Sequence, residues 1–113
     1  MMPMIARDVR KLVVDQIANR WDDTNSHRVN LRSALVAPSQ SKMILRLVRN
    51  GKIKDSTVDV WIVLLENPKG DGYIIFYDED RDQFGLASAG FPDDQHPVIC
   101  GYYGDFWTTF KGM

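Results

Sequence analysis

The stretch STVDVWIVLLE, residues 56–66, carries the strongest signal for the fold. From Val60 to Leu65 every residue is apolar, in the run VWIVLL. Successive side chains of a strand point to opposite faces of a sheet. A strand that is apolar on both faces is typical of a central strand that is covered on both sides. The run is also far too short to span a bilayer. We therefore expect a sheet whose middle strand lies here and whose two faces both need cover.

The segments around this strand predict an antiparallel meander of about five strands. Residues 29–36 alternate with a period of two, and Pro38 is expected to stop that strand. Residues 42–49 read as a second strand, and Asn50-Gly51 is a strong hairpin signal because both residues tolerate positive φ. Residues 73–77 and 83–88 follow as further strands, and the short apolar run VIC, residues 98–100, comes after a loop.

Helices are expected at both ends of the chain. Residues 4–21 carry an apolar face at helical spacing, and the polar run DDTNSH should end this helix. Near the C-terminus, Asp105 is a good N-cap, Phe106 and Phe110 lie four residues apart, and Gly112 is a plausible terminator. The order predicts an α+β domain with the N-terminal helix packed on a curved sheet, similar in outline to cystatin-like or nuclear-transport-factor-2-like folds.

The last thirteen residues, GYYGDFWTTFKGM, are unusually aromatic for a chain end. They contain five of the twelve Phe, Trp and Tyr residues. Because buried aromatic rings dominate protein cores, we expect this tail to dock on the sheet, where it could cover the face that the first helix leaves open. The alternative is a tail that faces a partner, since exposed Tyr and Trp clusters are typical of binding hot spots.

Length and composition fit one domain over residues 1–113. The hydrophobic content of 44% and the charged content of 26% are ordinary for a globular chain. The single cysteine, Cys100, excludes an internal disulfide, and we expect it to be buried and inert. The N-terminus carries no apolar stretch of signal-peptide length, which favours a cytoplasmic protein.

No catalytic, metal or cofactor motif is complete. Asp78, Asp80 and Asp82 have the first spacing of a calcium loop, but Gln83 stands where that loop needs Gly and Ala89 where it needs Glu. A nucleophilic cysteine needs a base within hydrogen-bond reach, and His96 and Cys100 are too far apart along an extended segment. We therefore expect no catalytic residues, no metal and no cofactor.

The charge distribution suggests a binding protein. Residues 1–54 hold eleven Lys and Arg against four Asp, and residues 55–113 hold three against eleven Asp and Glu, so a net charge of -1 hides halves of +7 and -8. Aromatic anchors within an acidic rim would suit a cationic protein partner, which opposite charge would steer. The candidate partner-binding residues are Asp78, Glu79, Asp80, Asp82, Phe84, Phe91, Asp93, Asp94, Tyr102 and Tyr103.

Two other functions stay open. The basic residues of the first half could track a phosphate backbone if they shared one sheet face, although the balanced total charge makes nucleic acid an unlikely partner. These residues are Arg28, Arg32, Lys42, Arg46, Arg49, Lys52 and Lys54. Alternatively, a small enzyme or ligand carrier could hold a pocket between helix and sheet, lined by Trp21, Trp61 and Tyr73. No membrane partner is expected.

The small size, the acidic aromatic half and the ending YYGDFWTTFKGM resemble small bacterial immunity proteins of contact-dependent toxin systems. Such proteins bind and neutralise one partner toxin, commonly a cationic nuclease. The resemblance implies a non-enzymatic inhibitor with one protein partner. It implies no particular site residues, because these proteins share no defining motif and no single fold.

Overall fold

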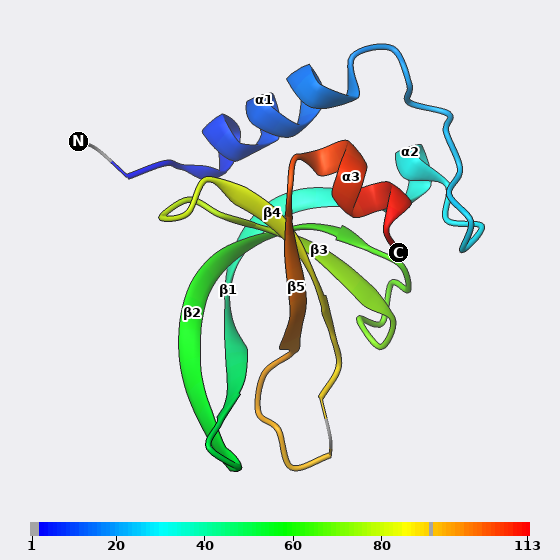
Figure 1. The fold of residues 1–113 in the computed structure, drawn as a ribbon. Helices are drawn as coiled ribbons and strands as arrows, with labels where there is room; N and C mark the ends of the chain where they lie inside the picture. The colour runs from blue at the N-terminus through cyan, green and yellow to red at the C-terminus, as the bar shows by residue number, and fades with distance from the viewer. Residues whose placement is uncertain (1–2, 91) are drawn as a thin grey trace.

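A computed structural model describes residues 3–90 and 92–113. Five strands form one closed barrel in the order β1-β2-β3-β4-β5, and three helices accompany it (Figure 1). The elements are α1 (Ala6–Ile17), α2 (Leu31–Ala34), β1 (Leu35–Arg49), β2 (Lys52–Leu65), β3 (Tyr73–Asp78), β4 (Gln83–Ser88), β5 (Val98–Gly104) and α3 (Phe106–Lys111). The predicted α+β class and the largely antiparallel five-stranded sheet are confirmed.

The sheet is the predicted meander, but it also closes on itself as a barrel, which was not predicted. β5 returns to β1 in parallel through the pair Ile44 and Val98. The backbone N–H of Ile44 donates to the carbonyl of Pro97 at 2.8 Å. Register shifts interrupt three of the four antiparallel ladders, and such irregularities bend strands and increase their twist. The accumulated curvature brings the last strand back to the first.

The expected break at Pro38 was wrong. Pro38 lies within the single long strand β1, inside the register shift between Leu35 and Ser39. Proline is tolerated at such an irregularity because its missing N–H is not needed for the ladder there. Of the residues predicted as a first strand, Asn30 forms an isolated bridge with Thr24 and caps the short helix α2, and only residues 35–36 are extended, as the start of β1.

The central strand β2 has two covered faces, as predicted, but the covers differ from the expected ones. Trp61, Val63 and Leu64 belong to a cluster that includes the buried residues of α1 and α3. Val60 belongs to a second cluster with Met43, Phe76 and other residues of the opposite sheet face. Both helices therefore cover the same face of the sheet. The closing strands, rather than the aromatic tail, cover the other.

Core docking of the aromatic tail is confirmed. Phe106 and Phe110 of α3 are completely buried, and their rings stack 6.1 Å apart. Asp105 is the N-cap, since its side chain accepts from the N–H of Thr108 at 2.7 Å. Gln16 of α1 accepts from the N–H of Phe106 at 2.7 Å, so a polar contact fixes one helix against the other.

The first helix is shorter than predicted. It ends at Ile17, because Ala18 has a positive φ of 56° that no helix continues through. Trp21 lies beyond it in a turn and packs at the edge of the helix-facing cluster. Within residues 3–90 and 92–113, no helix has both the length and the apolar character needed to cross a bilayer.

Candidate functional site

The acidic turn between β3 and β4 is organised by a buried carboxylate. Asp78, the last residue of β3, is only 1% exposed. One of its oxygens accepts from the backbone N–H groups of Asp80 and Arg81, at 3.1 and 3.3 Å. A side-chain carboxylate that accepts from N–H groups two and three residues on fixes a turn. Asp78 is thus a structural residue, and the turn that follows it has a defined shape.

The other oxygen of Asp78 connects the turn to β5. It accepts from the Tyr102 hydroxyl at 2.8 Å and from the Arg81 guanidinium at 3.2 Å. Arg81 also donates to the Tyr102 hydroxyl and lies over the Tyr102 ring, 4.8 Å from its centroid. Burial, reinforced by the bond to Asp78, raises the pKa of Tyr102 to about 12. Tyr102 therefore remains a protonated donor at any physiological pH.

Two further carboxylates on this turn have internal partners. Glu79 accepts from the indole N–H of Trp61 and from the N–H of Met4, each at 3.1 Å, and so joins the turn to β2 and to the residues before α1. Asp82, at a positive φ of 50°, accepts from the Tyr77 hydroxyl at 2.6 Å. Burial is the largest cause of a raised pKa at Tyr77, and the bond to Asp82 adds to it.

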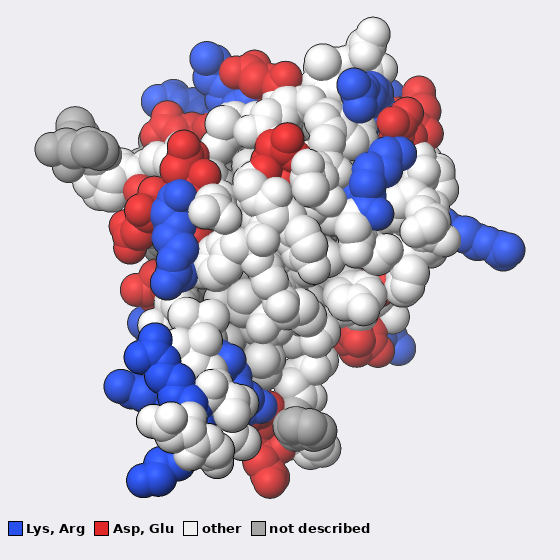
Figure 2. Space-filling model, in the orientation of Figure 1, with Lys and Arg blue, Asp and Glu red and all other residues white. Residues whose placement is uncertain are grey.

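Asp80 and Asp82 are the exposed carboxylates of this rigid acidic turn, defined as residues 79–82. The backbone N–H of Asp80 donates to Asp78, and the Asp80 side chain is exposed to solvent. Figure 2 shows acidic side chains gathered at the upper left, over the position of this turn in Figure 1, and basic side chains at the lower left. A fixed carboxylate cluster of this kind can attract and orient a cation or a cationic side chain.

The second predicted acidic loop lies elsewhere. Residues 92–97 lie at the opposite end of the barrel (Figure 1). There Asp94 accepts from Arg46 at 2.9 Å, and Arg46 is also paired with Asp55 at 2.8 Å. The two carboxylates raise the pKa of Arg46, and Arg46 lowers the pKa of Asp55. Asp93 is exposed, but the structure does not bring it near the acidic turn.

The predicted aromatic anchors differ in how far they are exposed to solvent. Phe84 is 2% exposed, and its ring contacts Tyr77 and Phe106, so it is part of the core. Tyr102 is half-buried beneath Arg81. Tyr103 is 39% exposed and is available on the surface. Phe91 lies outside the described residues.

The basic residues of the first half do not form one continuous face. Arg32 pairs with Asp22 at 3.1 Å and Lys42 with Asp59 at 2.8 Å, in addition to the Arg46 pairs. Arg49, Lys52 and Lys54 lie together near the end of the β1–β2 hairpin. Arg28 is exposed in the loop before α2, at a positive φ of 62°. A phosphate-tracking stripe along two strands is therefore not built.

The space between helix and sheet is filled. Val9 and Ile17 of α1 and Phe106 and Phe110 of α3 are completely buried there, and Trp61 is 7% exposed. Tyr73 packs against the same cluster and contacts the ring of His27 edge-on at 5.4 Å. The filled interface gives no support to a ligand pocket lined by Trp21, Trp61 and Tyr73.

The expectation for Cys100 was wrong, because its side chain is exposed. Residue 100 points outward from β5, where its thiol lies 3.6 Å from the Ser88 hydroxyl. In the described part of the chain, no three His, Cys, Asp or Glu side chains are close enough together to hold a metal ion.

Sequence reasoning missed the polar residues that hold the turns and helices in place. Asn25 is buried, donates to the carbonyl of Phe110 at 3.0 Å and accepts from the N–H of Val29 at 3.1 Å. Its position in the run DDTNSH gave no signal beyond a helix end. The role of Asp78 was also hidden, since its position in DEDRD does not distinguish the buried carboxylate from the three others of the run.

Comparisons of the chain with protein-family models, with curated proteins and with solved structures give no significant match.

Proposed function

We propose that the protein is a non-enzymatic binding protein that holds one cationic protein partner at the rigid acidic turn. The observation that carries this proposal is the buried Asp78. Through its four hydrogen bonds it fixes the turn, while Asp80 and Asp82 stay exposed. A preformed charged element binds at a smaller entropic cost than one that must order on contact.

The neighbouring surface fits a protein partner. Tyr103 on β5 is partly exposed, and the backbone of β5 beside it pairs with β4 at the base of the turn. A partly exposed tyrosine is a common anchor at protein interfaces. The resemblance to immunity proteins supports the same class of partner. In that case the partner would be a cationic toxin, which the bound protein would block.

The test is capture of a partner at low salt with matched charge variants. Asp80→Lys places a cation on the turn and leaves the side chains of Arg81 and Tyr102, which donate to Asp78, unchanged. Asp71→Lys makes the same charge change in the exposed loop between β2 and β3. We expect wild type and Asp71→Lys to retain one stoichiometric basic protein and Asp80→Lys to lose it. Equal retention by all three would exclude the acidic turn as the binding site.

A further inference from the structure

The β1–β2 hairpin projects beyond the barrel as a two-stranded ribbon. In the described part of the chain, β1 has no strand partner other than β2 after Ile44, and β2 has none other than β1 before Trp61. The five residues of β1 beyond Ile44 correspond to about 16 Å of strand. Asn50 and Gly51 have positive φ values of 52° and 74°, which close the ribbon with a tight hairpin turn.

The end of this ribbon, here called the hairpin tip (residues 47–54), exposes aliphatic side chains on both faces. Val48 is 68% and Ile53 69% exposed, and they lie directly opposite each other on one face. Leu47 is 42% exposed and pairs with Lys54 on the other face. A flat partner surface covers only one face of such a ribbon. A medium that surrounds the tip can bury all three side chains at once.

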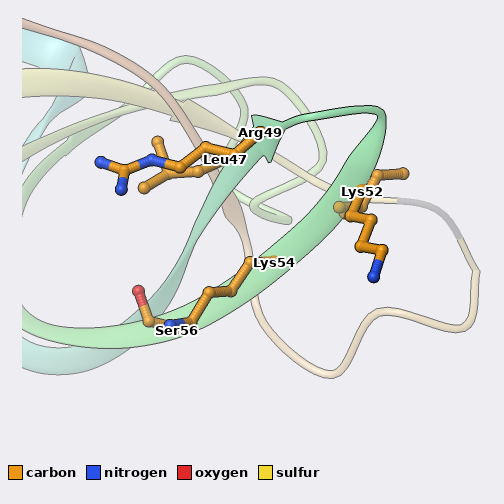
Figure 3. Close-up of a pocket in the computed structure, with 6 residues that line it drawn as sticks. Leu47, Arg49, Lys52, Lys54 and Ser56 are labelled. Carbon is orange, nitrogen blue, oxygen red and sulfur yellow. The ribbon is translucent and has the colours of Figure 1, made fainter.

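The hairpin tip is also cationic. It contains Arg49, Lys52 and Lys54 and no carboxylate. Among the residues that the structure describes, no ion pair involves any of the three. With Leu47 and Ile53 they line a hollow of about 570 Å³ on the ribbon (Figure 3). Excess positive charge requires an anionic partner, and it disfavours pairing of two copies tip to tip.

The ribbon is held in place at its base. Arg46 joins Asp55 of β2, at 2.8 Å, to Asp94 of the loop before β5, at 2.9 Å. The aliphatic and cationic groups beyond this point are therefore presented from a fixed position. Nucleic acid would use the cations but gain little from three aliphatic side chains, and residues 47–54 offer no aromatic ring for base stacking.

We propose that the hairpin tip docks on an anionic lipid surface. Leu47, Val48 and Ile53 enter the boundary between headgroups and acyl chains, and Arg49, Lys52 and Lys54 contact the anionic headgroups. Aliphatic residues flanked by Lys and Arg are the combination that gives interfacial binding without a spanning segment. This surface is separate from the rigid acidic turn, which lies at the other end of the barrel and would face away from the lipid.

Sedimentation with vesicles tests this proposal. The full chain is incubated with phosphatidylcholine vesicles that contain phosphatidylglycerol, and with vesicles of phosphatidylcholine alone. We expect binding to the first kind only, weakening as salt is added. Each cation near an anionic surface contributes about fivefold in partitioning, so Lys52→Gln with Lys54→Gln should reduce binding about 25-fold. Val48→Ser with Ile53→Ser should abolish it.

The control variants remove cationic and aliphatic side chains from the N-terminal part of the chain instead of the hairpin tip. Arg7→Gln with Lys11→Gln deletes two exposed cations of α1, and Ile5→Ser removes an aliphatic side chain that is 51% exposed. Both variants should bind anionic vesicles as well as wild type does. Asp80→Lys should bind them at least as well. All substituted side chains are exposed, so the variants should fold, which circular dichroism checks.

Two results would overturn the proposal. One is absence of binding to anionic vesicles by folded wild type. The other concerns the double variant Val48→Ser with Ile53→Ser. The proposal fails if this variant binds both a duplex oligonucleotide and anionic vesicles as well as wild type does. The second outcome would assign the tip to phosphate groups in general. Neither result bears on partner capture by the acidic turn, which the Asp80→Lys experiment decides separately.

Discussion

At the residue scale, the Tyr102–Asp78 hydrogen bond is the polar contact on which the acidic turn depends most. Tyr102 donates to a carboxylate that is 1% exposed, and Arg81 is the other side chain that does so among the described residues. A buried acceptor that loses a donor retains its desolvation cost. Tyr102→Phe should therefore lower the free energy of unfolding by about 1–3 kcal/mol. Urea unfolding measures this, and a change below experimental error would show that the bond contributes nothing.

The same tyrosine predicts a dependence on alkaline pH. The pKa of Tyr102 is about 12 in the folded protein against an ordinary 10.0. A pKa raised by folding means that the stabilisation is complete below pH 10 and is lost as pH rises toward 12. Wild type should thus lose more stability than Tyr102→Phe between these values. Parallel losses in the two proteins would contradict the raised pKa. Tyr77, whose pKa is also raised, contributes equally to both.

At the element scale, the segments with the clearest local signals were predicted best. The strand expected at 83–88 is β4, and the one at 73–77 is β3 without its last residue. Asp105 begins the last helix as expected. The errors came from long-range causes. Pro38 continues a strand because an irregular ladder accepts it, and residues 31–34 form a helical turn because the Asn30 side chain caps them.

The N-cap of α3 gives an element-scale prediction. The Asp105 carboxylate accepts from the N–H of Thr108, and hydrogen bonding by the side chain and then the backbone of Thr108 lowers the pKa of Asp105. Asp105→Ala should destabilise the protein by about 1 kcal/mol, whereas Asp105→Asn, which retains a cap oxygen, should cost much less. Because the pKa is lowered on folding, the stabilisation by Asp105 exists above the ordinary pKa and disappears in acid. Chemical unfolding of both variants at neutral and acidic pH provides the measurement. Equal effects of Ala and Asn would contradict a capping role.

At the scale of the whole molecule, closure of the barrel has one weak seam. β1 and β5 meet at the pair Ile44 and Val98, whereas β3 is paired along its length with both neighbours. Local opening follows the least-connected contacts. In native-state hydrogen exchange the Ile44 amide should therefore exchange at a lower free energy of opening than the amides of β3. Equal protection of both would show that the barrel opens only as a unit.

The charge asymmetry of the sequence suggested a binding protein but did not show how the charged groups are used. The acidic turn and the cationic hairpin tip do lie at different ends (Figure 2). The expected acidic surface, however, combined groups that folding separates. Asp94 pairs with Arg46, Phe84 packs in the core, and Asp78 forms hydrogen bonds within the turn. Sequence spacing cannot show which carboxylate will be buried, because that depends on Tyr102 and Arg81 meeting Asp78 in three dimensions.

The measurement that tests the central claim most directly is the association rate constant of the captured partner at increasing ionic strength. For wild type and Asp71→Lys, the proposed electrostatic steering by the acidic turn predicts fast association at low salt that slows as salt screens the charges. Asp80→Lys should associate roughly tenfold more slowly at low salt, with a dissociation rate that changes less. An association rate that is the same for all three proteins at low salt would contradict the assignment of partner binding to this turn.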